Sequence, residues 1–261
     1  MPAQTSALPL DADGKPYHRT WLVLTLLVGT FSTFVTQTLL TTAFPTLMAY
    51  FHISANAVQW LTTGFMLIMG IMIPVSAWML TRINSKVLYL AAMVIFGLGT
   101  ILAYFAVNFQ MLLIARMIQA MGVGISAPVF QTIMSSVYPP EKRGSAMGTA
   151  GIVIGLAPAI GPTLSGWIID NYNWRALFLF IMPINWLVII ISLFTLRKVL
   201  PTSKQPIDWW SVIISTVGFG SMLYGFSSVG DAGWGDPLVL VTLIVGIIFI
   251  GLFVHRQLHM D

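Results

Sequence analysis

The chain alternates between long apolar runs and short polar breaks. Eight of the runs are long enough to cross a bilayer as helices of about 20 residues. These runs are residues 21–44, 58–80, 87–107, 111–137, 146–169, 177–196, 209–229 and 238–254. The pattern predicts an all-α integral membrane protein with eight transmembrane helices.

The composition supports this class and excludes several others. Of the 261 residues, 57% are hydrophobic and 8% are charged, against about 25% charged in soluble proteins. Cysteine is absent, which excludes disulfides and thiolate metal sites. The four histidines, His18, His52, His255 and His259, share no metal-ligand spacing, and no Walker A, nucleophile-elbow or HExxH pattern occurs. We therefore expect no metal, no cofactor and no enzymatic activity.

Basic residues are sorted unequally between the two sides of the membrane. One side holds Lys15, Arg19, Arg82, Lys86, Lys142, Arg143, Arg197, Lys198, Lys204 and Arg256. The other side holds only Arg175, and Arg116 lies inside the fourth span. Because cytoplasmic loops retain Lys and Arg, we expect both termini of this chain in the cytoplasm and the helices in the cell membrane. The net charge of +4 then reflects topology, and no nucleic-acid partner is expected.

The N-terminal region and the tryptophans fit the same topology. Residues 1–20 are polar and carry Asp11 and Asp13, unlike a cleaved signal peptide, so the first apolar run is expected to remain as an anchor. The nine tryptophans fall mostly near the ends of the spans. We expect them to form interfacial aromatic belts.

Arg116 is the ionisable residue that lies deepest in a predicted span. Five residues beyond Met111, at about 1.5 Å each, place it roughly 8 Å into the helix. A charge at this depth costs on the order of 3 kcal/mol or more unless it finds polar partners. Its side chain either snorkels to the outer interface or is buried on a transport path, with Gln119 on the same face. Gly122 and Gly124 predict close approach of another helix.

The fifth apolar run contains an uncharged stretch rich in helix breakers, G-I-V-I-G-L-A-P-A-I-G-P-T-L-S-G, from Gly151 to Gly166. Small residues recur along one face, which lets another backbone come close; the members are Gly144, Gly148, Gly151, Gly155, Ala157, Gly161 and Ser165. Pro158 and Pro162 each remove a hydrogen-bond donor and permit a bend. Tight packing in any membrane bundle would explain the glycines, but it does not explain the two prolines. We predict a closely packed, bendable helix.

Three motifs in this order resemble those of the major facilitator superfamily. R-x-x-Q-A-x-G-x-G, from Arg116 to Gly124, resembles the fourth-helix motif, and the stretch from Gly151 to Gly166 resembles the fifth-helix antiporter motif of exporters. N-W-R-A-L-F-L-F-I-M-P-I-N, from Asn173 to Asn185, is similar to the segment that follows in drug:proton antiporters of the fourteen-span branch. The resemblance implies a cytoplasmic tail at residues 1–20, a six-helix transporter half at 21–198, and a linker with two additional helices at 199–261.

The chain also departs from the family pattern. T-Q-T-L-L-T-T-A-F-P resembles the motif ending the first helix, yet Thr36 and Gln37 stand where many relatives carry an acid. Thr81 and Asn84 replace the usual acid and glycine of the cytoplasmic gating motif, leaving Arg82 and Lys86 of its charge pattern. Arg143 belongs to the loop that, in the superfamily, touches this gating loop. Gln37, roughly 12 Å from the outer end of its helix, is compatible with a polar cluster shared with Arg116.

The acidic residues leave the energy source open. All eight lie in predicted tails or loops: Asp11, Asp13, Glu141, Asp170, Asp208, Asp231, Asp236 and Asp261. Arginine cannot carry the proton because its pKa is above about 12. Either the proton site lies in a missing second half, or Asp170 or Asp231 takes part at the outer mouth, or the coupling differs.

The leading hypothesis is secondary active efflux of lipophilic, amphipathic or cationic compounds by alternating access, driven by protons. Alternating access needs a second repeat, so the chain is expected to be a C-terminally truncated piece whose partner is the missing C-terminal half. Candidate cavity residues are Gln37, Met66, Met69, Met117, Met121 and Gln131. The alternatives are a non-transporting membrane remnant or assembly partner and, third, an importer of small solutes.

Overall fold

The computed structural model describes residues 9, 11, 14–200 and 209–259, and every regular element among them is a helix except for one bridge residue at Pro16. The helices are α1 (Arg19–Thr42), α2 (Phe44–Phe51), α3 (Ala55–Arg82), α4 (Ser85–Tyr104), α5 (Phe109–Val137), α6 (Pro140–Gly155), α7 (Ala157–Asn171), α8 (Ala176–Thr195), α9 (Trp209–Ala232) and α10 (Pro237–Leu258). Most of the predicted linker, with Lys204 and Asp208, lies outside the described residues, as do Asp13 and Asp261.

The eight predicted spans are confirmed as helices long and apolar enough to cross a membrane. Several extend beyond the apolar runs, because a membrane helix continues into the interface once its backbone is hydrogen-bonded. The third span, for example, begins at Ser85 behind an Asn84 side chain that caps Lys86 N at 2.9 Å. The first span ends earlier than predicted, at Thr42, and the short helix α2 follows it.

The fifth span is interrupted at Leu156, which separates α6 from α7. Pro158 has no N–H to donate to the carbonyl group of Ile154, so the α-helical ladder stops there. In the first turn of α7 the same proline is well tolerated, because the first amides of a helix have no intrahelical partner. Pro162 lies inside α7 without ending it. The predicted bend therefore becomes a break at one residue.

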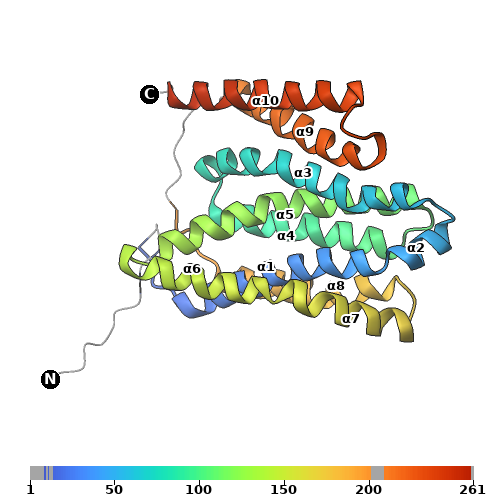
Figure 1. The fold of residues 1–261 in the computed structure, drawn as a ribbon. Coiled ribbons are helices and arrows are strands. Elements are labelled where there is room, and N and C mark those ends of the chain that lie inside the picture. The colour runs from blue at the N-terminus through green and yellow to red at the C-terminus, as the bar shows by residue number, and fades with distance from the viewer. Residues whose placement is uncertain (1–8, 10, 12–13, 201–208, 260–261) are drawn as a thin grey trace.

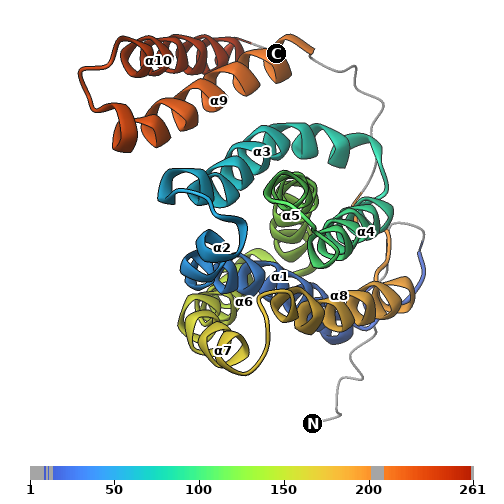
Figure 2. The ribbon, with the colours of Figure 1, turned by 90° about the vertical axis from the view of Figure 1, so that its right-hand side faces the viewer.

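Six spans form a bundle, and α9 and α10 form a hairpin against its side (Figures 1 and 2). Within the bundle, α5 packs on α3 and α4, whereas α1 packs on α7 and α8. The hairpin contacts α3 through α9. There, Ser227 Oγ donates to Thr63 Oγ1 at 3.0 Å, the ring centroids of Trp60 and Tyr224 are 6.2 Å apart, and Leu223 packs over Gly70.

The described residues of the basic set cluster at the end of the bundle where α1, α4 and α6 begin. We call this end the basic end. Figure 1 shows the described parts of both chain ends on this side and α2 at the opposite end. Arg175, just before α8, lies at that opposite end. The predicted sorting of basic residues therefore corresponds to two ends of one bundle.

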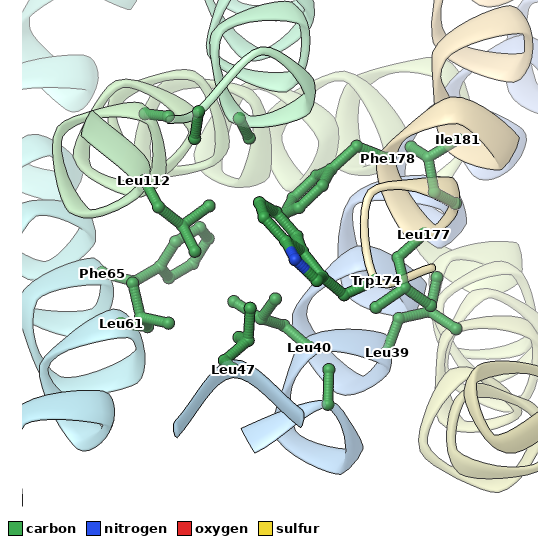
Figure 3. Packing of buried hydrophobic residues seen from close by; sticks show 14 of the residues in the cluster. Leu39, Leu40, Leu47, Leu61, Phe65, Leu112, Trp174, Leu177, Phe178 and Ile181 are labelled. Atoms are coloured by element: carbon green, nitrogen blue, oxygen red, sulfur yellow. The ribbon is translucent and has the colours of Figure 1, made fainter. Parts of the chain in front are cut away.

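Trp174 corrects the expectation that the tryptophans are interfacial anchors. It is 2% exposed and packs edge-on against Phe178, with ring centroids 6.3 Å apart. Figure 3 shows it between α1, α2 and α8, among Leu39, Leu40 and Leu47. The tight turn between α7 and α8 directs this side chain inward. By contrast, an exposed interfacial position fits Trp21, Trp167, Trp210 and Trp234.

Candidate functional site

The centre of the candidate site is Arg116, which lies on α5 and has no solvent-exposed surface. Its side chain is enclosed by α3, α4 and α5. It therefore does not snorkel to the interface, whereas its place on a transport path stays a prediction. A buried guanidinium in a membrane protein requires hydrogen-bond partners, because its charge has lost its hydration.

Gln119 supplies the shortest of these bonds. Arg116 Nη1 donates to Gln119 Oε1 at 2.8 Å, and Gln119 Nε2 donates in turn to Thr100 Oγ1 at 2.9 Å. The Thr100 hydroxyl then donates to the carbonyl oxygen of Phe96, one turn back in α4, at 2.8 Å. The three side chains form a fully buried polar chain that links α5 to α4.

The rest of the guanidinium meets weak partners. Arg116 Nε is 3.5 Å from the carbonyl oxygen of Leu61, and the guanidinium carbon lies 4.2 Å from the centroid of the Phe65 ring, both on α3. Nη2 has no hydrogen-bond partner among the described residues. No described carboxylate bonds to Arg116, so its partners solvate the positive charge without neutralising it.

Close helix packing holds this cluster in place. A Cβ built on Gly122 would lie 2.5 Å from the carbonyl oxygen of Ala92 in α4, and one built on Gly124 would lie 2.6 Å from the Cβ of Met72 in α3. Only glycine permits these distances. The two glycines of the fourth-helix motif thus face two different neighbours and fix α5 between them, as the spacing predicted.

Thr36 and Gln37 do not join the Arg116 cluster. The hydroxyl of Thr36 is buried and donates to the carbonyl oxygen of Ser32 at 2.7 Å, within its own helix. Gln37 is half-buried and does not bond to Arg116. The predicted shared cluster was wrong on this point, because depth along a helix does not determine which neighbour a residue faces.

The small-residue stripe of the fifth span divides into two parts. Its part in α7 packs on α1: the Cβ position of Gly161 collides with the Thr38 side chain, and Thr38 Oγ1 donates to Ala157 O at 3.3 Å. At Gly144, Gly148, Gly151, Gly155 and Gly166, in contrast, nothing in the described chain lies within 4 Å of a built Cβ. The packing role of Gly151, Gly155 and Gly166 stays a prediction, and so does any gating role of Pro158 and Pro162.

Arg175 joins elements at the opposite end of the bundle. Its Nη2 donates to Ala106 O, after α4, at 2.7 Å and to the Tyr50 hydroxyl in α2 at 3.2 Å. The guanidinium carbon also lies 4.4 Å from the centroid of the Trp174 ring. Arg175 therefore fastens the turn before α8 to α2 and to the end of α4.

The two predicted gating arginines at the basic end make local contacts. Arg143 Nε donates to Tyr138 O at 3.1 Å, across the turn between α5 and α6. The guanidinium carbon of Arg82 lies 5.9 Å from the centroid of the Trp78 ring, one turn earlier in α3. These contacts position both charges, and their gating role stays a prediction.

The described acids lie away from the bundle core. Asp170 is exposed in the last turn of α7, and Asp236 caps α10 by accepting from Leu238 N at 2.8 Å. Glu141 is exposed in the first turn of α6. The side chain of Asp231 lies outside the described residues.

The predicted cavity methionines behave differently from one another. Met66 and Met121 are exposed, whereas the Met117 methyl group packs over Gly64 and the Met69 backbone over Gly124. Gln131 is exposed on α5.

Sequence reasoning missed Thr100 and Phe65, which contact the cluster, because a lone Thr or Phe in an apolar run carries no distinguishing signal. Asn185 was also missed as a buried link, donating to Met93 O at 3.2 Å.

In the described residues, eight helices are long and apolar enough to cross a membrane, and one of them carries a buried arginine; this arrangement defines a polytopic α-helical membrane protein. Residues 26–260 match the family described as Major Facilitator Superfamily, and the chain belongs to this family of membrane transporters.

Its relatives include resistance proteins. The chain is 48% identical to the uncharacterized MFS-type transporter YcnB of Bacillus subtilis over 94% of this chain and 52% of that protein. It is 40% identical to the lincomycin resistance protein LmrB of the same organism, over 92% of this chain and 50% of LmrB. It is 30% identical to the multidrug resistance protein B homolog of Mycobacterium tuberculosis, over 85% of this chain and 42% of that protein. The chain spans about half the length of these relatives.

Solved structures share the fold. A mutant of the peptide transporter POT in complex with sulfate matches with a TM-score of 0.66 and 16% identity, over 88% of this chain and 51% of that one. A bacterial homolog of the human lysosomal transporter Spinster, in an inward-facing conformation, matches with a TM-score of 0.56 and 18% identity. The match covers 90% of this chain and 61% of that one.

Proposed function

We propose that the chain is the N-terminal portion of a secondary active exporter of lipophilic, amphipathic or cationic compounds in the fourteen-span branch of the family. The names of the relatives, lincomycin resistance protein and multidrug resistance protein, support export as the direction. Residues 21–198 would form one six-helix half, residues 199–261 would supply the linker and two additional helices, and the remaining half would follow.

The observation that carries the site assignment is the incomplete solvation of Arg116. Its charge is buried among neutral partners, and Nη2 finds no acceptor in the described part of the chain. Such a group responds strongly to any anion or dipole that approaches it in a low-dielectric interior. We propose that Arg116 and Gln119 form the coupling site, and that Thr36 and Gln37 line the path on α1.

Alternating access would use the open glycine face of the fifth span. A closely packed moving interface needs small residues, and Gly144, Gly148, Gly151 and Gly155 leave space in front of α6. We propose that this face meets the second half of the transporter. The break at Leu156 would then let α6 tilt while α7 stays attached to α1.

For the energy source we propose proton antiport, with the proton-carrying acid outside the described residues or at Asp170. Arginine stays charged throughout. The described chain buries no carboxylate that could take up a proton in the membrane interior. We further propose that the basic end faces the cytoplasm, since ten basic residues belong to that side.

The test is export by the full-length gene product in a host that lacks its own efflux pumps. Ethidium and lincomycin are suitable probes, with a protonophore to collapse the proton gradient. We expect Arg116→Ala to abolish export at normal membrane expression, and Thr132→Val, on the same helix, to leave it unchanged.

Full export by Arg116→Ala would refute the site. No efflux of any probe by the unsubstituted protein would favour the membrane-remnant or assembly-partner function, and proton-independent efflux would refute antiport. Uptake assays test the importer alternative.

A further inference from the structure

A small pocket opens at the basic end, between the segment that leads into α1 and the end of α8. Its volume is about 130 Å³. Tyr17, His18 and Trp21 line one side, and Phe194 and Arg197 line the other. Figure 2 shows α1 and α8 side by side, and the two helices are also bridged by Thr25 Oγ1 and Thr195 Oγ1, 3.0 Å apart.

The pocket carries positive charge that the described chain does not neutralise. The side chains of Arg197 and His18 form no hydrogen bond or ion pair with the described residues, and no acidic residue lines the pocket. Lys86 lies nearby: its Nζ donates to the carbonyl oxygen of Leu193, near the end of α8, and its charge and that of Arg197 repel each other. This arrangement suits an anionic ligand, since arginine presents a fork of donors that matches a phosphate group.

Tyr17 adds a neutral polar group on the α1 side. Its side chain is 7% exposed, and its main-chain N–H donates to Pro9 O at 3.0 Å, which fixes the segment before α1. Burial raises the pKa of the Tyr17 phenol, so it stays protonated at neutral pH. The described residues that line the pocket therefore carry no negative charge, and the nearby acid Asp11 acts on the Tyr17 phenol.

Two exposed apolar stripes begin at this pocket and run toward the middle of the membrane. On α1, Trp21 is 61% exposed and is followed on the same face by Leu24 and Val28, both exposed. On α8, Phe194 is 75% exposed and is preceded on its face by Ile190 and Leu187, also exposed. A ligand bound here would meet cations at the interface and hydrocarbon-like surface below them.

We propose that this pocket binds the phosphate group of an anionic phospholipid, whose acyl chains lie along the exposed faces of α1 and α8. A soluble phosphate would use the cations but not the stripes, and a zwitterionic lipid would use the stripes but gain less from the cations. Basic pockets between transmembrane helices recognise anionic headgroups in this way. The site is distinct from the Arg116 cluster and does not depend on transport.

The test measures lipid retention by native mass spectrometry of the full-length protein in detergent. Phosphatidylglycerol and phosphatidylcholine with identical acyl chains are the two probes. We expect phosphatidylglycerol to be retained preferentially, and Arg197→Gln to weaken its apparent affinity on the order of fivefold, the loss expected when one basic residue is removed from an anionic surface. Arg197→Lys should retain most of the preference, and phosphatidylcholine binding should not change in either variant.

Lys142→Gln is the matched control, because Lys142 is an exposed cation at the same end that does not line this pocket. It should bind phosphatidylglycerol as the unsubstituted protein does. If Arg197→Gln does not elute as a monodisperse protein, Lys86→Gln, which removes the neighbouring cation, provides the comparison. Equal retention of the two lipids, or an unchanged preference in the pocket variants, would overturn the proposal. Displacement of phosphatidylglycerol by excess inorganic phosphate would also overturn it, in favour of a soluble-anion site.

Discussion

The hydroxyl group of Ser165 in α7 donates a hydrogen bond of 2.7 Å to the main-chain carbonyl oxygen of Leu39 in α1. Both residues are buried. Carbonyl oxygens inside a helix already accept one bond, and this additional bond between helices requires the two backbones to approach closely. Gly161, one turn before Ser165, makes that approach possible. The α7 part of the fifth span is therefore fastened to α1 by small residues.

Gly161→Ala should destabilise the protein because the added methyl group meets the Thr38 side chain. Overpacking of this kind costs about 1–3 kcal/mol. Gly166→Ala, in the same helix, is the matched control: nothing lies within 4 Å of its Cβ position, and alanine favours the helix. The unfolding temperature of each purified variant in detergent tests this. A Gly161→Ala protein as stable as Gly166→Ala would show that the close contact is absent.

Thr100→Val should destabilise the buried chain that solvates Arg116. The substitution removes the acceptor of the Gln119 amide and leaves that amide unpaired in a buried position, at a cost of about 1–3 kcal/mol. Thr132→Val removes a hydroxyl that donates only to its own helix, at Pro128 O. Thermal unfolding should therefore separate the two valine variants. Equal unfolding temperatures would argue against the Gln119–Thr100 bond.

Arg175→Ala should loosen the end of the bundle opposite the basic end. It removes the hydrogen bonds to Ala106 O and the Tyr50 hydroxyl and the contact with Trp174, so a loss of about 1–3 kcal/mol is expected. Arg175→Lys keeps the charge but cannot span all three partners, and we expect an intermediate loss. Limited proteolysis and thermal unfolding check this order. Equal stability of the lysine variant and the unsubstituted protein would show that charge alone suffices.

A disulfide should form between α3 and α9 in the double variant Thr63→Cys with Ser227→Cys. The two hydroxyl oxygens are 3.0 Å apart, and the described chain has no native cysteine to interfere. The control pair is Thr63→Cys with Gly230→Cys, since nothing lies within 4 Å of the Gly230 Cβ position. After mild oxidation, only the first pair of cysteines should be protected from labelling by maleimide. Equal labelling of both pairs would place the hairpin elsewhere.

Some features follow from the local pattern alone. The eight spans and the place of Arg116 in the fourth of them are predictable because a bilayer accepts only long apolar helices, whose length can be counted along the chain. Likewise, Pro158 and Pro162 predict a bend in the fifth span, because a missing N–H acts within one turn, and the structure has its break beside Pro158. Gly122 and Gly124 are identifiable as close-contact positions for a similar reason.

Other features depend on which helices become neighbours. Thr100 and Phe65 are 16 and 51 positions away from Arg116 along the chain, and only the packing of α3 and α4 against α5 brings them to it. Trp174 resembles an interfacial anchor until α2 and α8 enclose it, and Gln37 has a suitable depth but does not bond to Arg116. Hydropathy and spacing therefore determine each span and its depth, whereas the rotation of each helix is decided by tertiary packing, because side chains and small-residue contacts from several helices must fit together at once.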